Sequence, residues 1–94
     1  MNYKNNFSSR LLACRTLKSI SQKALADELG ISDAAVTMME KSKRAPSFEI
    51  LCALADYFDV SLDYLVGRTD CPDIVTKDKD GNFIVVEAMQ PHKD

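Results

Sequence analysis

Basic side chains gather in the first half of the chain, and three of them lie close together at Lys41, Lys43 and Arg44. Residues 1–48 hold eight basic and four acidic side chains, a net charge of +4, whereas residues 49–94 hold four and ten, a net charge of −6. Clustered ammonium and guanidinium groups bind phosphate oxygens, which nucleic acid offers. The overall charge of −2 therefore does not argue against nucleic acid, because the positive charge is concentrated in one half.

The stretch that leads into this basic cluster predicts two short helices joined by a tight turn, over about residues 22–29 and 33–41. Ser21 and Ser32 are the candidate N-caps, and Gly30 supplies the turn. Two helices joined in this way are typical of a helix-turn-helix, whose second helix lies in the major groove of DNA.

The second of these helices has two faces of different character. Val36, Met39 and the aliphatic stem of Lys43 recur at three- and four-residue intervals and are expected to pack inward. The positions expected to face outward are Ala34, Thr37, Met38 and Lys41.

The residues before this stretch predict a first helix that ends at Ser19. Residues 1–6 are polar and are expected to be frayed, so Ser8 or Ser9 is the candidate N-cap. The residues expected on its apolar face are Leu11, Leu12, Cys14 and Leu17.

Two more helices are expected after the basic cluster. Ser47 can cap a fourth helix that ends in a turn at Asp59 and Val60, and Ser61 can cap a short fifth helix closed by Gly67. The apolar face of the fourth helix is expected to hold Phe48, Ile50, Leu51, Leu54, Ala55 and Phe58.

Beyond residue 69 the composition changes. β-branched and aromatic residues at 74–75 and 83–86 flank a turn at 78–81, which predicts a β-hairpin. The turn DKDGN begins like a calcium-binding loop, but Phe83 and Met89 stand where that loop needs Gly and Glu, so a hairpin turn is favoured. The predicted fold is all-α: a compact five-helix domain over residues 1–69, then a linker and a short hairpin or extended tail over residues 70–94, which is a candidate dimerisation element.

Several other classes of site are not expected. No apolar run approaches the roughly 18 residues of a membrane span, and the first residues lack the apolar core of a signal peptide, so we expect a cytoplasmic protein. Cys14, Cys52 and Cys71 are far apart and the single histidine is His92, so no metal, cofactor or disulfide is expected. Cys14 and Cys52 lie on apolar faces and are expected to be buried, and Cys71 exposed. No arrangement of Ser/His/Asp or Cys/His indicates catalytic residues or an enzyme.

An ordered set of motifs between residues 8 and about 69 closely resembles the lambda and 434 repressor-like helix-turn-helix family, also called the Xre family. The motifs are Ser-Gln at the start of the second helix, Leu-Gly before the turn, a Glu ending the third helix, a Lys-Arg-x-Pro-Ser loop, and Val-Ser-Leu-Asp-Tyr-Leu ahead of Gly. The resemblance implies a DNA-binding transcriptional regulator, a repressor in many such proteins.

The resemblance also implies roles for single residues. Gln22 matches a Gln that contacts a phosphate or is braced near a base, and Arg15 with Glu40 matches an ion pair between the first and third helices; two separate solvated charges are the alternative. The other matching positions would face bases or track the phosphate backbone. The implied DNA-binding residues are Gln22, Lys23, Ser32, Asp33, Ala34, Thr37, Met38, Lys41, Lys43 and Arg44.

The positions that would read bases depart from the family pattern, which favours Arg, Gln, Ser, Thr or Asn. Asp33 can accept a hydrogen bond from cytosine N4, or it is simply a first-turn acid favoured by the helix dipole. Ala34, Ala35 or Met38 can touch a thymine methyl group. Affinity is thus expected to rest on phosphate contacts and specificity on shape and methyl contacts. Ser42 replaces the usual Gly after the helix, which either adjusts the loop or makes it rigid.

The expected partners are near-palindromic double-stranded DNA and a second copy of the chain, because one helix-turn-helix covers half a site. The candidate dimer residues, some of which must belong to the core, are Tyr57, Phe58, Leu62, Tyr64, Leu65, Ile84, Val85 and Val86. The alternative function is an antitoxin or anti-repressor that binds a protein partner through the hairpin or the acidic half and binds DNA weakly.

Overall fold

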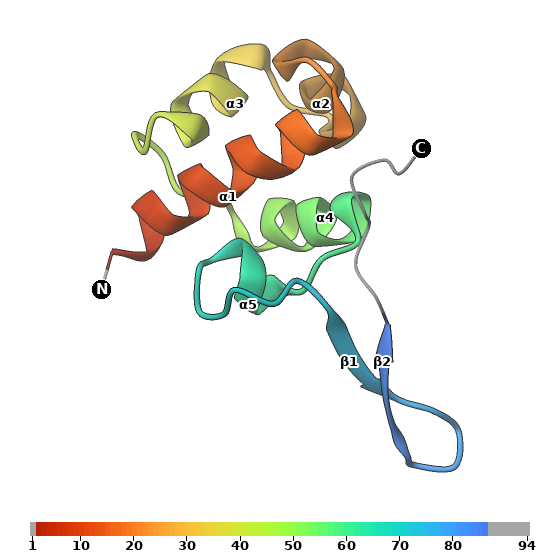
Figure 1. The fold of residues 1–94 in the computed structure, drawn as a ribbon. Coiled ribbons are helices and arrows are strands. Elements are labelled where there is room, and N and C mark those ends of the chain that lie inside the picture. Colours follow the sequence, from red (N-terminus) through yellow and green to blue (C-terminus); the bar gives the residue numbers. More distant parts are fainter. Residues whose placement is uncertain (1, 87–94) are drawn as a thin grey trace.

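The structure is a computed structural model that describes residues 2–86, so predictions that fall on residues 87–94, among them the C-terminal tail with His92, lie outside the described residues. Five helices precede one antiparallel hairpin (Figure 1), which confirms the predicted fold class. The elements are α1 (Tyr3–Lys18), α2 (Gln22–Leu29), α3 (Asp33–Glu40), α4 (Phe48–Phe58), α5 (Leu62–Leu65), β1 (Ile74–Lys77) and β2 (Phe83–Val86).

Four of the five helices begin at a serine that caps them. Each serine hydroxyl oxygen accepts a hydrogen bond, 3.0–3.2 Å long, from the backbone N–H three residues ahead. Each bond satisfies an N–H group that the first helical turn leaves without an intrahelical partner. The structure thereby confirms all four predicted caps, which are Ser21, Ser32, Ser47 and Ser61.

The start of α1 differs from the prediction. Asn2 caps the helix, because its Oδ1 accepts a hydrogen bond of 3.0 Å from the N–H of Asn5. Residues 3–6 are consequently helical, the expectation of a frayed start is wrong, and neither Ser8 nor Ser9 is a cap. At the other end, Ser19 takes a left-handed conformation and ends α1 as predicted.

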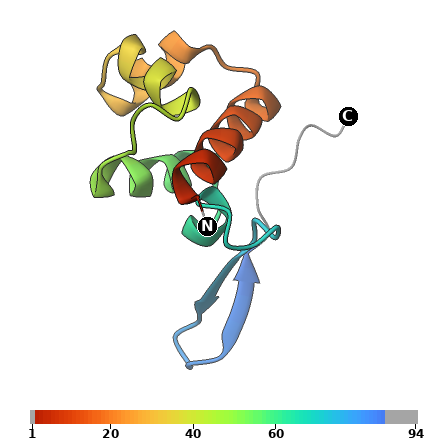
Figure 2. The same ribbon diagram turned by 90° about the vertical axis from the view of Figure 1, so that its left-hand side faces the viewer.

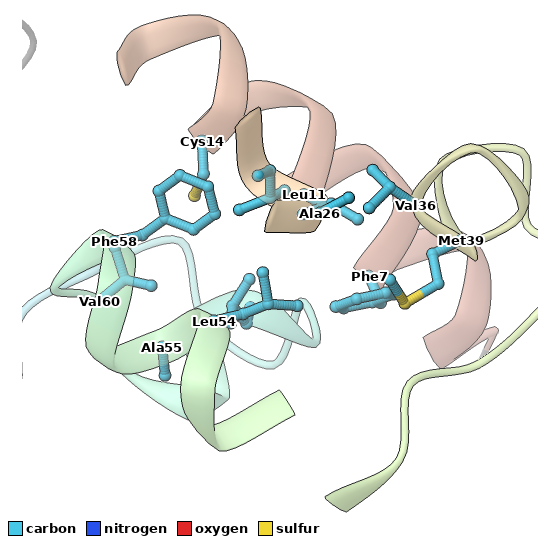
Figure 3. Packing of buried hydrophobic residues seen from close by; sticks show 12 residues of the cluster. Phe7, Leu11, Cys14, Ala26, Val36, Met39, Leu54, Ala55, Phe58 and Val60 are labelled. Atoms are coloured by element: carbon cyan, nitrogen blue, oxygen red, sulfur yellow. The ribbon is translucent and has the colours of Figure 1, made fainter. Parts of the chain in front are cut away.

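The hydrophobic core lies where the five helices meet (Figure 3). Phe7 and Met39 point toward one another there, and the Phe58 ring lies beside Cys14. Val60, expected only in the turn after α4, is also buried. The large side chains that are almost completely buried are Phe7, Leu11, Leu25, Val36, Met39, Leu54, Phe58 and Leu65.

Three apolar residues that were expected on inner faces are exposed instead. Leu12 and Leu17 are 45% and 48% exposed because the buried stripe of α1 runs through residues 7, 11 and 14. Phe48 is 74% exposed at the first position of α4. Cys52 is only half-buried, so the prediction of a buried thiol is wrong there, whereas Cys14 is buried and Cys71 exposed as expected.

The hairpin pairs β1 with β2 in an antiparallel register in which Val75 lies opposite Val85. Its turn is held by Asp78, whose Oδ1 accepts hydrogen bonds from the N–H groups of Asp80 and Asn82 at 2.9 and 3.0 Å. This confirms the predicted hairpin turn. Figures 1 and 2 both show the hairpin standing away from the helices, at the opposite end of the protein from α3.

Arg10 ties the segment before the hairpin to the helical body. Its guanidinium donates hydrogen bonds to the carbonyl oxygens of Tyr64 and Thr69 and to the Asp70 carboxylate, at 3.1, 3.0 and 2.8 Å. These contacts reach both sides of the boundary expected near residue 69. The division into residues 1–69 and 70–94 stays a prediction.

Candidate nucleic-acid interface

The outer face of α3 is the part of the helix-turn-helix that is open to a ligand. Asp33 and Ala34 are exposed and Met38 is 41% exposed, as expected, and Thr37 is half-buried. Ala35, however, is buried, so the expectation that it touches a thymine methyl group is wrong. It shares the inner face of α3 with residues 36 and 39, one and four positions further along the helix.

Behind this face, Arg15 of α1 forms the expected ion pair with Glu40 of α3. Arg15 donates from Nε to Oε2 at 2.5 Å and from Nη2 to Oε1 at 3.0 Å, a two-point contact. The side chains of Arg15 and Glu40 are 18% and 7% exposed, so the pair is largely withdrawn from water. The hydrogen bond to Glu40 raises the pKa of Arg15 above its usual value. The pair therefore holds α3 against α1 as a fixed charge contact.

The same network reaches the first residue of α2. Gln22 donates from Nε2 to Glu40 at 2.9 Å, and its Oε1 accepts a hydrogen bond of 2.9 Å from the Thr37 hydroxyl. The side chain of Gln22 is thus braced between Glu40 and Thr37, and its contact with a phosphate or a base stays a prediction. Since the Thr37 proton is used inward, its hydroxyl can present only acceptor lone pairs to a base.

The cationic edge of this surface is the segment that follows α3. Lys41, Lys43 and Arg44 are all exposed there, and Lys23 is exposed at the start of α2. The expectation that the stem of Lys43 packs inward is wrong, because α3 ends at Glu40 and Lys43 lies beyond it. Lys41 directly follows α3 and Arg44 lines a groove beside the start of α3, so these cations lie next to the helix, where they can meet phosphate groups.

Ser8 and Ser42 fix the shape of that segment. Ser8 is 4% exposed; its hydroxyl donates to the carbonyl oxygen of Met39 at 2.5 Å and accepts from the Ser42 hydroxyl at 2.9 Å. Ser42 has φ of 60°, a left-handed conformation that glycine would adopt without strain. Its bond to Ser8 favours the rigid-loop alternative. This role of Ser8 was not predicted from the sequence. The spacing could have indicated it, because Ser8 lies one residue after Phe7 and three before Leu11, and both of these residues belong to the buried stripe of α1.

A groove of about 160 Å³ lies between the starts of α3 and α4. Its polar wall is formed by Ser32, Arg44 and Ser47, two of which are helix caps. Two helix N-termini and a guanidinium group beside one groove suit an anionic group such as a backbone phosphate. Ser47 was predicted only as a cap, and this placement adds it to the candidate interface.

The candidate dimer residues fall into three groups. Phe58 and Leu65 are completely buried in the core, so their assignment to a dimer surface is wrong. Tyr57 and Tyr64 are half-buried, and a cation lies over each ring. Lys18 Nζ is 3.8 Å from the centroid of the Tyr57 ring, and Arg10 Cζ is 4.1 Å from the centroid of the Tyr64 ring. The residues left exposed are Leu62, Ile84 and Val85, whereas the side chain of Val86 lies outside the description.

Other kinds of site have little support in residues 2–86. None of the described helices is long and apolar enough to cross a membrane, and no three His, Cys, Asp or Glu side chains in this range are grouped as metal ligands. Burial raises the pKa of the Cys14 thiol to about 11, with nearby Arg10 opposing part of the shift. The buried thiol of Cys14 therefore stays protonated and unreactive at neutral pH.

Comparison with known proteins gives consistent matches to this part of the chain. The family model described as "Helix-turn-helix" matches residues 11–65. The uncharacterized HTH-type transcriptional regulator YqaE of Bacillus subtilis is 42% identical over 60 residues, which are 64% of this chain and 52% of that protein. The HTH-type transcriptional regulator AnsR of the same organism is 42% identical over 59 residues, 63% of this chain and 51% of AnsR. This chain spans about half the length of these two relatives.

A solved structure agrees with these relatives. The DNA-binding domain of the P22 C2 repressor, residues 1–76, matches with a TM-score of 0.62 and 35% sequence identity, over 70% of this chain and 86% of that domain. Residues 11–65, which the family model matches, contain α2, α3 and the hydrogen-bond network behind them. The structure of the P22 C2 domain has itself been compared with the DNA-binding domain of the 434 repressor. This chain therefore belongs to the helix-turn-helix family of the lambda and 434 repressor (Xre) type.

Proposed function

We propose that this chain is a transcriptional repressor that binds double-stranded DNA as a homodimer, with α3 in the major groove. The observation that supports this most directly is the combination of an exposed outer face of α3 with a closed hydrogen-bond network behind it. A helix held in this way can enter a groove without reorganising, so little ordering cost opposes binding. Membership of a family whose relatives are named transcriptional regulators supports the same function.

Affinity would come largely from phosphate contacts. Lys41, Lys43 and Arg44 border α3 and would follow one strand, while Lys23 and the N-terminus of α2 at Gln22 would meet the other side of the groove. Lys23 already lies 3.7 Å from Asp27, an exposed pair that costs little to break. Each cation that neutralises a phosphate makes binding more sensitive to salt.

Sequence reading would depend on few hydrogen bonds. Ala34 and Met38 would contact thymine methyl groups, Asp33 would accept from cytosine N4, and Thr37 would offer acceptor lone pairs. Ser32 would remain at the helix cap, close to a phosphate. This set supplies little direct readout of guanine, so the shape and deformability of the operator would contribute much of the specificity.

A single α3 covers about half of a site. A twofold dimer on a near-palindrome places two recognition helices roughly 34 Å apart, one turn of DNA. The regulator would work in the cytoplasm, without a catalytic centre or a cofactor.

A second candidate function is supported by the acidic and apolar character of the exposed residues. Asp33 and Met38 are unusual on a base-reading surface, and the hairpin exposes apolar side chains that can bind protein. An antitoxin or anti-repressor would bind a protein through these surfaces and DNA weakly. Retention on heparin or duplex DNA, compared with co-purification of a protein partner, distinguishes the two functions.

A charge substitution tests the proposal. Met38→Glu adds an acid to the exposed face of α3, and Leu12→Glu adds the same charge at a similarly exposed position of α1. Fluorescence anisotropy with a mixed-sequence duplex at low salt should detect binding by the wild type and by Leu12→Glu, with a loss of at least about tenfold for Met38→Glu. Equal losses for both variants, or no salt-dependent association by the wild type, would contradict the proposal.

A further inference from the structure

A hydrogen-bond relay of Glu40, Gln22 and Thr37 connects the interior ion pair to the outer face of α3. Gln22, the first residue of α2, bonds to Glu40 on one side and to the Thr37 hydroxyl on the other, both at 2.9 Å. Thr37 and Glu40 are three positions apart, so they share one side of α3 and a single amide group can reach both. The amide can do so because α2 and α3 lie side by side (Figures 1 and 2). The relay therefore joins a buried charge to the surface that is proposed to face DNA.

The chemistry of each group fixes the direction of every bond in the relay. The Glu40 carboxylate only accepts hydrogen bonds, and it takes two from Arg15, at 2.5 and 3.0 Å. The Gln22 amide must therefore turn its Nε2 toward Glu40, which leaves its Oε1 facing Thr37. Because Oε1 cannot donate, the single proton of the Thr37 hydroxyl must point at it. The orientation of this hydroxyl thus follows from the carboxylate at the other end of the relay.

The relay limits what α3 can offer to a base. A threonine hydroxyl that is free to rotate can donate to a base or accept from one, but the proton of Thr37 is committed to Gln22. Asp33, one turn earlier on the same side of α3, is also an acceptor, while Ala34 and Met38 have no donor group. Within α3, all of which the structure describes, the outer face therefore presents acceptors and apolar groups and no side-chain donor.

We infer that Gln22 and Glu40 are positioning residues for base recognition, which restrict Thr37 to bases that donate in the major groove. These bases are adenine, through N6, and cytosine, through N4. Guanine offers N7 and O6 and thymine offers O4, all of them acceptors, so either base opposite Thr37 would leave an acceptor unpaired in the interface. The inference rests on the proposed DNA-binding function and names the class of base that this position of the site takes.

This role of Gln22 is compatible with a phosphate contact. Its Nε2 carries two N–H groups, and the bond to Glu40 uses one of them. The second N–H can donate to a phosphate oxygen. A substitution of Gln22 therefore changes both affinity and base preference, and the experiment must separate the two effects.

The test compares base preference in four proteins, each the full chain: wild type, Gln22→Met, Thr37→Val and Lys23→Met. Methionine keeps the length of Gln22 without its amide, and valine keeps the shape of Thr37 without its hydroxyl. Lys23→Met is the matched control, because it removes a neighbouring exposed cation that is proposed to bind phosphate. None of the substitutions touches the Arg15–Glu40 pair, so the fold should be retained.

Selection of bound duplexes from a random pool, with the wild type and with Thr37→Val, identifies the base pair at which only the wild type has a preference. Anisotropy then measures the affinity of each protein for four duplexes that differ at that pair. The wild type should bind the duplexes with adenine or cytosine opposite Thr37 about three- to tenfold more tightly than those with guanine or thymine.

The variants separate base preference from affinity. Lys23→Met should weaken binding to all four duplexes and keep the ratio of the wild type. Gln22→Met should reduce that ratio to less than about twofold, because a released hydroxyl can donate as well as accept. The inference is overturned if Gln22→Met keeps the ratio of the wild type, if the wild type prefers guanine or thymine, or if no base pair depends on Thr37.

A measurement without DNA distinguishes a failure of this inference from a failure of the proposed function. The Thr37 hydroxyl proton, observed by NMR at low temperature, should exchange with water at least about tenfold more slowly in the wild type than in Gln22→Met. Equal exchange rates in a chain that does enrich a duplex overturn the relay and leave the proposed function standing. If the wild type enriches no duplex although this exchange is slow, the proposed function fails and the base preference fails with it.

Discussion

Removal of Arg15 should destabilise the fold more than the loss of any surface charge. Arg15→Met leaves the Glu40 carboxylate, 7% exposed, with Gln22 as its remaining donor. Breaking a buried pair by deleting one partner costs about 3–5 kcal/mol. Because the Arg15 side chain is 18% exposed and one donor remains, we expect a loss of about 2–3 kcal/mol in the free energy of unfolding. For a domain of this size the melting temperature should fall by about 10–20 °C.

Urea denaturation followed by circular dichroism at 222 nm measures this loss. Asp27→Asn is the matched control, because its pair with Lys23 is 3.7 Å long and both side chains are about 70% exposed, so we expect a cost below about 0.5 kcal/mol. The double variant Arg15→Met/Glu40→Met leaves neither charge buried. Its loss should be smaller than the sum of the two single losses by about 1.5–3 kcal/mol. Additive losses, or a loss for Arg15→Met no larger than that of the control, would refute the reasoning.

Three further predictions concern the loop and the core. Lys43→Ala/Arg44→Ala should weaken binding to all duplexes and reduce the slope of log affinity against log salt by about 2, as measured by anisotropy at several salt concentrations. Ser8→Ala should cost about 1 kcal/mol in urea denaturation and speed amide exchange in the segment after α3, because it removes two hydrogen bonds; unchanged exchange there would contradict the rigid loop. Burial raises the pKa of the Cys14 thiol from 9.0 to about 11, so the stability that this thiol contributes is complete below pH 9. Between pH 9 and pH 11 the free energy of unfolding should fall by up to about 3 kcal/mol on account of this thiol, and that part of the loss should be absent in Cys14→Ala.

The local signals in the sequence were sufficient for most helix boundaries. A serine cap and the N–H that it satisfies are three residues apart, so Ser21, Ser32, Ser47 and Ser61 could be recognised without knowledge of the fold. Asn2 follows the same rule, but the polar composition of residues 1–6, which is typical of a frayed terminus, hides it. The turn of the hairpin was likewise a local feature.

Long-range packing explains what the sequence could not predict. Leu12 and Leu17 have the same character as Leu11, and only the position of the other helices makes Leu11 the buried one. The contacts of Arg10 join residues 54 to 60 positions apart, and those of Ser8 join residues 31 and 34 positions apart. Within the site, the exposure of Met38 followed from helical spacing, whereas the burial of Ala35 depended on how α3 rests on the core.

The central claim is that the outer face of α3 reads DNA while the adjacent cations bind phosphate. A selection of bound sequences from a random duplex pool, followed by anisotropy on the enriched duplex, tests it most directly. We expect an inverted repeat with half-sites about one helical turn apart, and affinity that falls steeply as salt rises. A pool without enrichment, together with no salt-dependent association with any duplex, would contradict the account.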